Sequence, residues 1–237
     1  MTGTLFGIGL GPGAPDLMTL RAHRLISAAQ VIAYPAPDSG ESFARSIAAD
    51  AIPADAVEIP MIVPMRVERF PAQEVYADAA VKITAHLDAG KDVVVLCEGD
   101  PFFYGSFMYL FARLSKAHPV EIVPGVSSLA GCTAAVPQPL VARNDVLTVL
   151  PGPLPDGDLR ARIDASDAVA IMKVGRHLGR LKALLSSMDL LDHAKYVERA
   201  TLENQRVLPL CEADESAPYF SMILITKGSD PWLNNAL

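Results

Sequence analysis

The sequence predicts an α/β protein built from two domains. Its 237 residues are enough for one large or two modest domains. In the first half, short apolar runs alternate with segments of helical period, which is typical of parallel strands covered by helices on both faces. A stretch rich in Gly, Pro and Ser at residues 124–139 separates this half from a second one. We therefore expect domains at residues 1–125 and 126–237, with the linker at about 119–139.

The first half is expected to form a mainly parallel sheet. Val93–Cys97 is an uninterrupted apolar run and reads as a buried strand. Before it, apolar residues recur at three- to four-residue spacing over Pro71–Ala89, and Gly90 supplies a helix stop. The other expected elements are strands at Leu5–Leu10 and Val31–Tyr34, and helices at Leu17–Ala29, Ser42–Ala51 and Phe107–Leu114.

The second half is expected to form a mixed sheet. A helix is predicted at Leu178–Met188, and Gln205–Leu210 could pair as part of a hairpin. Because little helical sequence separates the last strands, their connections suit antiparallel pairing. The expected strands are Val146–Leu150, Ala168–Met172, Tyr196–Val197 and Phe220–Ile225.

Composition argues against several classes of protein. A hydrophobic share of 51% and a mean hydropathy of +0.27 are too high for a disordered chain. No apolar run reaches the roughly 18 residues of a membrane helix, and no secretory signal pattern follows Met1. We therefore expect a cytoplasmic protein without a membrane partner. The net charge of −7, with no basic run, argues against nucleic acid as a partner.

Cysteine and histidine predict neither a disulfide framework nor a protein-held metal. The three cysteines are odd in number and widely spaced, so we interpret all of them as buried small hydrophobic residues. The five histidines never pair at metal-ligand spacing. The cysteines are Cys97, Cys132 and Cys211.

A Gly-rich turn follows the first expected strand, at residues 7–16. It matches the dinucleotide-binding pattern GxGxxG/A loosely, and Asp38 lies at a plausible distance for a ribose carboxylate. Against that function, Pro12 and Pro15 remove two amide donors that would bind pyrophosphate. A nicotinamide or flavin site and a turn without a ligand are both open alternatives. The residues that match the pattern are Gly9, Gly11 and Ala14.

Two further loops carry residues suited to ligands. Residues 98–106 follow a predicted central strand and hold two carboxylates, two glycines and three aromatic rings, at an edge where open α/β sheets bind ligands. Asp100 could accept from a ribose or an ammonium group, or it could cap a helix that starts near Pro101. The rings could equally belong to the core. The loop at residues 123–132 has small residues that allow close backbone contact.

The order and spacing of these motifs identify a resemblance. In the first half the motifs are Gly9–Gly13 with Asp16 and Thr19–Leu20, then Glu98–Pro101 with Tyr104–Gly105, then Pro124–Ser128. In the second half they are Met172–Arg176, Glu198–Thr201, Gln205–Val207 and Tyr219–Met222. Over essentially the whole chain they resemble the tetrapyrrole methyltransferases. Within that family, Cys97–Tyr109 and Met172–Arg176 are most similar to the enzymes that methylate carbon C20 of precorrin-2.

The resemblance implies a homodimer of two-domain α/β chains that binds S-adenosylmethionine (SAM) in a cleft between the domains. It also implies release of S-adenosylhomocysteine and methylation of a tetrapyrrole precursor of cobalamin (vitamin B12). Many members have Gly or Ser in place of Glu98 and Gly in place of Ala200, so the Glu98 carboxylate could face a different group. The implied SAM-binding residues are Pro12, Glu98, Gly99, Asp100, Phe103, Tyr104, Ser127, Ser128, Val174, Ala200 and Met222.

Methyl transfer from a sulfonium mainly requires aligned reactants and exclusion of water, so the sequence identifies no catalytic residue. Glu98 and Asp100 are the nearest candidates for a general base. The substrate carboxylates require a local basic patch, for which Lys173, Arg176 and Arg180 are the first candidates, with a solvated helix face as the alternative. Two further clusters carry the same ambiguity, Arg21 with Arg24 and Arg66 with Arg69.

Three classes of function are compatible with the sequence. The first is a SAM-dependent C-methyltransferase, including sister enzymes that act on other corrin or sirohaem precursors. The second is a nicotinamide-dependent oxidoreductase, which rests on the loose glycine pattern. The third is a ligand-binding module without catalysis. Metal-free and cobalt-containing substrates both fit the first class, because the metal would sit in the macrocycle.

Overall fold

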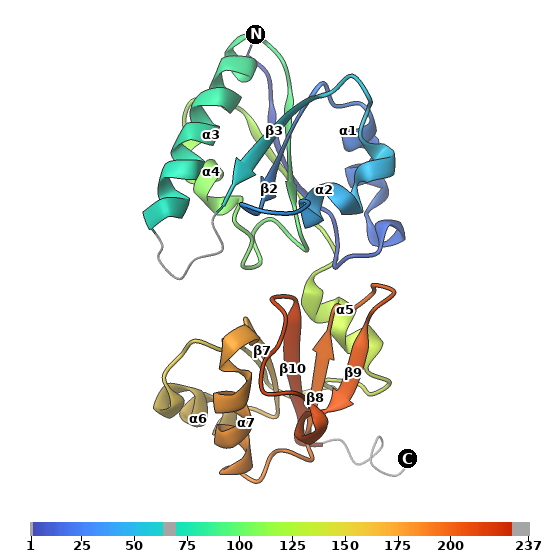
Figure 1. Cartoon of the computed structure of the whole chain (residues 1–237), viewed down its shortest axis with the longest axis vertical. Helices are drawn as coiled ribbons and strands as arrows, with labels where there is room; N and C mark the ends of the chain where they lie inside the picture. Colours follow the sequence, from blue (N-terminus) through green and yellow to red (C-terminus); the bar gives the residue numbers. More distant parts are fainter. Residues whose placement is uncertain (1, 64–69, 229–237) are drawn as a thin grey trace. The chain divides into compact units, whose positions relative to one another are not determined.

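The computed structural model describes residues 2–63 and 70–228. The chain divides into two compact units, Met1–Ser127 and Ser128–Leu237, and each is a sheet with helices on both faces (Figure 1). The stretch at 119–139, where we expected the linker, contains the last strand of the first unit and the first helix of the second. Within the described residues, no helix combines the length and apolar character needed to cross a membrane.

The first unit contains a five-stranded sheet in the order β3-β2-β4-β1-β5. Every strand pairing is parallel, which confirms the expected mainly parallel sheet. Sequence analysis missed β3, because its exposed and buried residues alternate at the sheet edge and Pro60 interrupts the apolar run. The strands are β1 (Leu5–Gly9), β2 (Val31–Ala36), β3 (Val57–Ile62), β4 (Val93–Cys97) and β5 (Val120–Val123).

Helices cover both faces of this sheet, which explains why β4 is apolar throughout. Alternate residues of β4, including Val95, pack with α3 (Phe70–Asp88) and α4 (Met108–Leu114). The intervening residues, including Leu96, pack with α1 (Leu20–Ser27) and α2 (Phe43–Ile47) on the opposite face (Figure 1). Full burial stabilises each such side chain by roughly 1.5–3 kcal/mol. The two apolar faces therefore fix β4 at the centre of the unit.

Two helix starts differ from expectation. The segment Pro15–Leu17 is a 3₁₀ turn, and α1 begins only at Leu20, where Thr19 Oγ1 accepts a hydrogen bond from Ala22 N at 3.1 Å. The alternative in which Asp100 caps a helix that starts near Pro101 is wrong, since α4 begins at Met108, close to the start expected for Phe107–Leu114. Residues 101–104 form a turn instead, and Tyr104 adopts a left-handed φ of 59° that a helix does not tolerate.

The second unit contains the mixed sheet that the sequence predicts, in the order β6-β7-β10-β8-β9. β6 and β7 are parallel, whereas β10 is antiparallel to both β7 and β8. β9 pairs antiparallel with β8 and so forms the expected hairpin. The strands are β6 (Leu147–Pro151), β7 (Ala168–Met172), β8 (Ala194–Glu198), β9 (Arg206–Pro209) and β10 (Ser221–Thr226).

The described part of the second unit also contains three α-helices. α6 (Asp156–Asp164) and α7 (Leu178–Ser186) cover one face of the sheet, and α5 (Ser128–Ala135) covers the other (Figure 1). Only α7 was expected. α5 consists mainly of small residues, and in α6 only Leu159 and Ile163 are buried, so neither helix carries a wide apolar stripe in its sequence.

The cysteines are all free thiols, and their burial only partly follows expectation. Cys97 and Cys132 are buried, as predicted, and burial raises the pKa of both thiols. The expectation of a buried Cys211 is wrong, because this residue is exposed. It lies in the 3₁₀ turn Leu210–Glu212, in which Leu210 fills the core position.

Candidate functional site

Three neighbouring strands bring the predicted ligand loops together. β4, β1 and β5 lie side by side and parallel, so the loops that follow them leave from the same edge of the sheet. We call residues 9–16, 98–106 and 124–127 the loop edge. The three loops that the sequence marks as suited to ligands therefore meet within the first unit.

Backbone hydrogen bonds join the first two loops. Leu10 N donates to Cys97 O at 2.9 Å, and Gly11 and Gly99 then exchange bonds of 3.2 and 2.8 Å as an isolated antiparallel bridge. Gly11 has a φ of +87° and Gly99 a φ of +65°, where an L side chain costs roughly 1–2 kcal/mol. Backbone conformation therefore explains both glycines without a ligand.

Asp100 links the second loop to the third. Its Oδ1 accepts from the backbone N–H groups of Phe102 at 2.9 Å and Phe103 at 3.1 Å, and its Oδ2 accepts from Gly125 N at 3.1 Å. Two of these bonds close the local turn, in the manner of an N-cap. The third spans 25 residues of sequence and fixes the two loops against each other.

Two glycines allow the loops to pack at backbone contact. A Cβ atom on Gly125 would lie 2.1 Å from Gly99 O, and one on Gly9 would lie 2.5 Å from Gly125 N. Real side chains do not approach backbone atoms this closely. The loop edge therefore requires glycine at both positions to keep its shape.

The Glu98 carboxyl faces helix α2. Burial raises its pKa, and hydrogen bonds from its own backbone N–H and from that of Ala44, in α2, oppose this shift. The resemblance to the family left open which group the Glu98 carboxylate faces. In this structure, that group is helix α2 of the same unit. Backbone N–H groups thus hold both carboxylates that were the nearest candidates for a general base.

The aromatic residues of the second loop divide into two groups. Phe102 packs against Phe107 and Phe111 at ring-centroid distances of 6.1 and 5.1 Å. Phe103 and Tyr104 contact each other edge to face at 5.4 Å. Tyr104 is 41% exposed despite its strained left-handed φ. A strained and exposed ring at a loop tip is typical of a binding position.

The basic residues expected at the substrate separate into two kinds. Lys173 has a left-handed φ of 57° and is exposed, as is Arg176 in the 3₁₀ turn Gly175–His177. The Arg180 guanidinium is half-buried instead and donates to Leu154 O at 3.1 Å, to Gly152 O and to the Asp156 carboxylate. It therefore ties the 152–156 turn to α7.

Of the other basic clusters, Arg21 forms an ion pair with Glu121 of β5. Arg66 and Arg69 lie outside the described residues. His177 follows Arg176 directly in the chain. Burial and the charges of Arg180 and Arg176 lower the pKa of His177, which indicates a locally positive field. Within residues 2–63 and 70–228, no group of three or more His, Cys, Asp or Glu could hold a metal ion.

In the second unit, three of the residues matched to SAM have buried side chains, whereas Ser128 is half-buried. Val174 is fully buried against α7, and Ala200 and Met222 lie in the core beneath α5. Only their backbone groups are available to a ligand. Ala200 lies between Arg199 and Thr201, which have left-handed φ values of 50° and 71°. These two strained residues mark the turn after β8 as a second candidate binding segment.

One polar cluster that was not predicted from the sequence lies beside a cavity of about 420 Å³. Arg45, on α2, donates to Glu58 at 2.6 and 2.8 Å, and the Tyr34 hydroxyl donates to the same carboxylate at 2.6 Å. These bonds, chiefly those from Arg45, lower the pKa of Glu58 to about 2. Because the three residues come from separate elements, their spacing in the sequence does not predict that they form a cluster. Their mutual pairing gives the cluster a structural role.

A comparison of the sequence with models of protein families shows which family the chain belongs to. A family model, "Tetrapyrrole (Corrin/Porphyrin) Methylases", matches residues 4–214. The chain belongs to the tetrapyrrole methylases. This tetrapyrrole methylase is 39% identical to a protein named "Precorrin-2 C(20)-methyltransferase" from Sinorhizobium, over 96% of this chain and 97% of the relative. It is 32% identical to the "Cobalt-precorrin-2 C(20)-methyltransferase" of Salmonella typhimurium, over 96% and 98% of the two chains.

Other relatives agree with this membership. The tetrapyrrole methylase is 44% identical to "Cobalamin biosynthesis protein CobIJ" of Mycobacterium tuberculosis, over 95% of its own length but only 46% of that protein. It thus spans about half the length of the mycobacterial relatives. A solved uroporphyrin-III C-methyl transferase from Thermus thermophilus, in complex with S-adenyl homocysteine, matches with a TM-score of 0.69 and 25% identity over 95% of this chain and 92% of that one.

Proposed function

We propose that this tetrapyrrole methylase transfers the methyl group of SAM to carbon C20 of precorrin-2 in cobalamin biosynthesis. The observation that carries the proposal is the 39% identity with the Sinorhizobium precorrin-2 C(20)-methyltransferase over almost the full length of both proteins. The Salmonella relative is named for the cobalt-containing substrate. Cobalt-precorrin-2 is therefore the second substrate form to test.

The loops of the first unit fit SAM better than a dinucleotide. The loop edge, residues 9–16, 98–106 and 124–127, contains three carboxylates and no lysine or arginine, which suits the cationic sulfonium and ammonium groups of SAM. In the dinucleotide pattern, the glycine turn leads directly into a helix whose N-terminus binds pyrophosphate. Here Gly11 pairs with Gly99, and α1 begins only at Leu20. These features argue against the oxidoreductase alternative.

The proposed SAM contacts come from both units and are mainly backbone groups. The side chains of Val174 and Met222 are buried, and both Asp100 oxygens already accept hydrogen bonds. The side chains proposed to contact SAM directly are those of Phe103 and Tyr104. The full proposed set is Pro12, Glu98, Gly99, Asp100, Phe103, Tyr104 and Ser127 in the first unit, and Ser128, Val174, Ala200 and Met222 in the second.

The contribution of this chain to catalysis is alignment of the two reactants. SAM supplies an electrophilic methyl group, and C20 of the substrate is nucleophilic through conjugation with the pyrrole nitrogens. The transfer consumes positive charge, so the surroundings of the methyl group chiefly need to be fixed and dry. The hydrogen bonds among the three loops give the first unit a fixed surface for this purpose.

Calorimetry followed by product analysis tests this function. We expect S-adenosylhomocysteine to bind and NADH not to bind. Incubation with ¹³C-methyl SAM and either precorrin-2 or cobalt-precorrin-2 should add one methyl group, which NMR should locate at C20. Binding of NADH alone would support the oxidoreductase alternative. Binding of S-adenosylhomocysteine without turnover of either macrocycle would support a ligand-binding module.

The proposal includes a cytoplasmic location and a homodimer. The resemblance to the family and the 51% hydrophobic share both favour a second copy as partner. We expect light scattering at micromolar concentration and ordinary salt to give twice the chain mass of 25.3 kDa. A monomer mass under these conditions would refute the dimer.

The exposed cations Lys173 and Arg176 are proposed to bind carboxylates of the tetrapyrrole. Replacing both by alanine should weaken tetrapyrrole binding about tenfold, since charge-assisted hydrogen bonds are lost. The affinity for S-adenosylhomocysteine should stay within about twofold, because those two side chains are not among the proposed SAM contacts. Two separate titrations measure this.

A matched control is the pair Lys91→Ala and Lys116→Ala. These exposed lysines precede β4 and β5, at the end of the first sheet opposite the loop edge. The control should leave both affinities unchanged. Unchanged tetrapyrrole binding in the Lys173 and Arg176 double variant would show that these cations only face solvent. Arg180 is excluded from this test because its guanidinium holds the 152–156 turn.

A further inference from the structure

The turn after β8 has a strained backbone. Arg199 and Thr201, on either side of Ala200, have left-handed φ values of 50° and 71°. Each such non-glycine residue costs of order 1–3 kcal/mol and persists only where its surroundings fix it. Backbone bonds supply part of this support, since Arg199 N donates to Phe220 O at 2.9 Å and Thr201 N donates to the Gln205 side chain at 2.7 Å.

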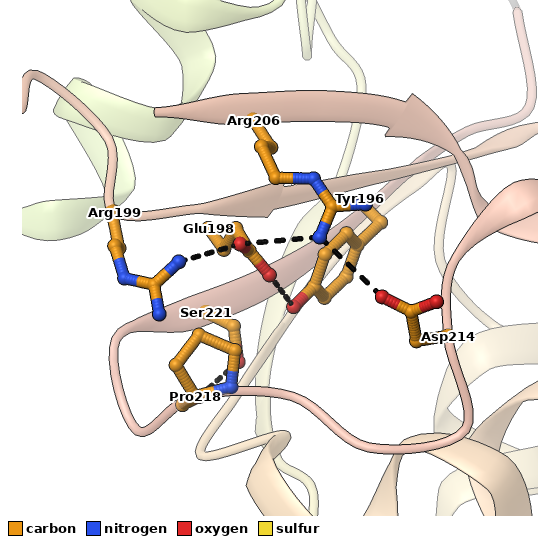
Figure 2. A network of polar contacts seen from close by, with 7 residues as sticks. All are labelled: Tyr196, Glu198, Arg199, Arg206, Asp214, Pro218 and Ser221. Atoms are coloured by element: carbon orange, nitrogen blue, oxygen red, sulfur yellow. Dashed lines mark hydrogen bonds and ion pairs between the residues drawn. The ribbon is translucent and has the colours of Figure 1, made fainter. Parts of the chain in front are cut away.

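A buried carboxylate supplies the rest of the support for the strained turn after β8. Glu198, at the end of β8, is only 4% exposed. Its Oε2 accepts from the Tyr196 hydroxyl at 2.6 Å, and its Oε1 accepts from Arg199 Nη1 at 2.7 Å. Arg206 Nη1 lies 3.5 Å from the same Oε1 and 3.4 Å from Asp214 Oδ2 (Figure 2). Because every one of these groups is paired, the negative charge of Glu198 is tolerated inside the unit.

This network, which comprises Tyr196, Glu198, Arg199, Arg206, Asp214 and Ser221, connects three strands. Glu198 of β8 is in register with Arg206 of β9 and with Ser221 of β10. The Ser221 hydroxyl donates to Pro218 O at 2.8 Å (Figure 2). Burial and the Glu198 carboxylate raise the pKa of Tyr196, so its hydroxyl stays a donor. The network therefore borders both Ala200 and Met222 along the chain.

We propose that Glu198 is a positioning residue for SAM. It fixes the 199–201 turn and the start of β10, and so holds the backbone groups of Ala200 and Met222 in the arrangement that SAM requires. This inference rests on the proposed function, since it takes Ala200 and Met222 as cofactor contacts. A network with a purely structural role would stabilise the second unit without affecting cofactor affinity.

The test compares cofactor affinity with stability in the full chain. Glu198→Gln keeps the shape of the side chain but removes the charge that holds Arg199 and Arg206. We expect the dissociation constant of S-adenosylhomocysteine and the KM for SAM to rise about tenfold, with kcat within about twofold. Tyr196→Phe removes one hydroxyl from the network and should give a smaller rise, about threefold. This milder variant keeps the inference testable if Glu198→Gln does not fold.

The control is Ile163→Val, which trims a fully buried side chain of α6 that lies outside the polar network, in the same apolar cluster as Tyr196. It should lower the melting temperature without changing cofactor affinity by more than about twofold. If both network variants lower the melting temperature but bind S-adenosylhomocysteine like the wild type, the positioning role is refuted. If the wild type itself does not bind S-adenosylhomocysteine, the proposed function fails, and this inference fails with it.

Discussion

Gly125→Ala is expected to destabilise the protein and abolish S-adenosylhomocysteine binding. The new methyl group would lie 2.1 Å from Gly99 O and 2.8 Å from Gly9 Cα, and both neighbours are backbone atoms that cannot rotate away. Relief requires the second and third loops to separate, which strains the bond from Gly125 N to Asp100. Overpacking of this kind costs roughly 1–3 kcal/mol, occasionally more. Thermal denaturation and calorimetry measure the two effects.

Gly157→Ala is the matched control for this substitution. Gly157 lies in α6, and a Cβ atom there would meet nothing within 4 Å. Alanine favours a helix over glycine by about 1 kcal/mol, so the control should melt at the same temperature or slightly higher and bind normally. If Gly125→Ala behaved like Gly157→Ala, the close packing of the loop edge would not be required for cofactor binding.

Substitution of Asp100 is expected to have the second large effect. Asp100→Ala leaves the N–H groups of Phe102, Phe103 and Gly125 without their acceptor. Each lost hydrogen bond costs about 1 kcal/mol, and the second loop loses its link to the third. We therefore expect a loss of about 2–3 kcal/mol in stability and a fall of more than about tenfold in S-adenosylhomocysteine affinity.

Asp100→Asn separates the two roles of this carboxylate, which are to close the local turn and to link the second loop to the third. The amide oxygen can still accept from Phe102 and Phe103, but the amide nitrogen cannot accept from Gly125 N. This variant should keep most of the stability and lose most of the affinity. The control is Asp92→Ala, which removes one carboxylate bond of 2.7 Å from Thr4 N near the opposite end of the sheet. An equal loss of cofactor affinity in this control would falsify a specific role for Asp100.

Local sequence pattern was enough to predict the fold class, both sheet types and the three loops of the loop edge. Each of these follows from local pattern, because a strand covered on both faces must be apolar throughout, as β4 is. Parallel strands then bring their following loops to one edge. Elements whose burial depends on neighbours were not predictable in this way. The edge strand β3 and the helices α5 and α6 have short or alternating apolar patterns that resemble loops.

The partners of the polar side chains could not be predicted from local pattern, because they depend on how the chain packs. Arg176 and Arg180 look equivalent in the sequence, yet Arg180 is held by the 152–156 turn and Arg176 faces solvent. Asp100 accepts a hydrogen bond from the backbone of Gly125, and Glu98 accepts one from the backbone of Ala44. Both donors are distant from their acceptors in the chain. Hydrogen bonds are short-ranged and directional, so they depend on how distant segments meet after folding. Residue type and spacing fix which groups can bond, and the packing of the sheets fixes which of them do.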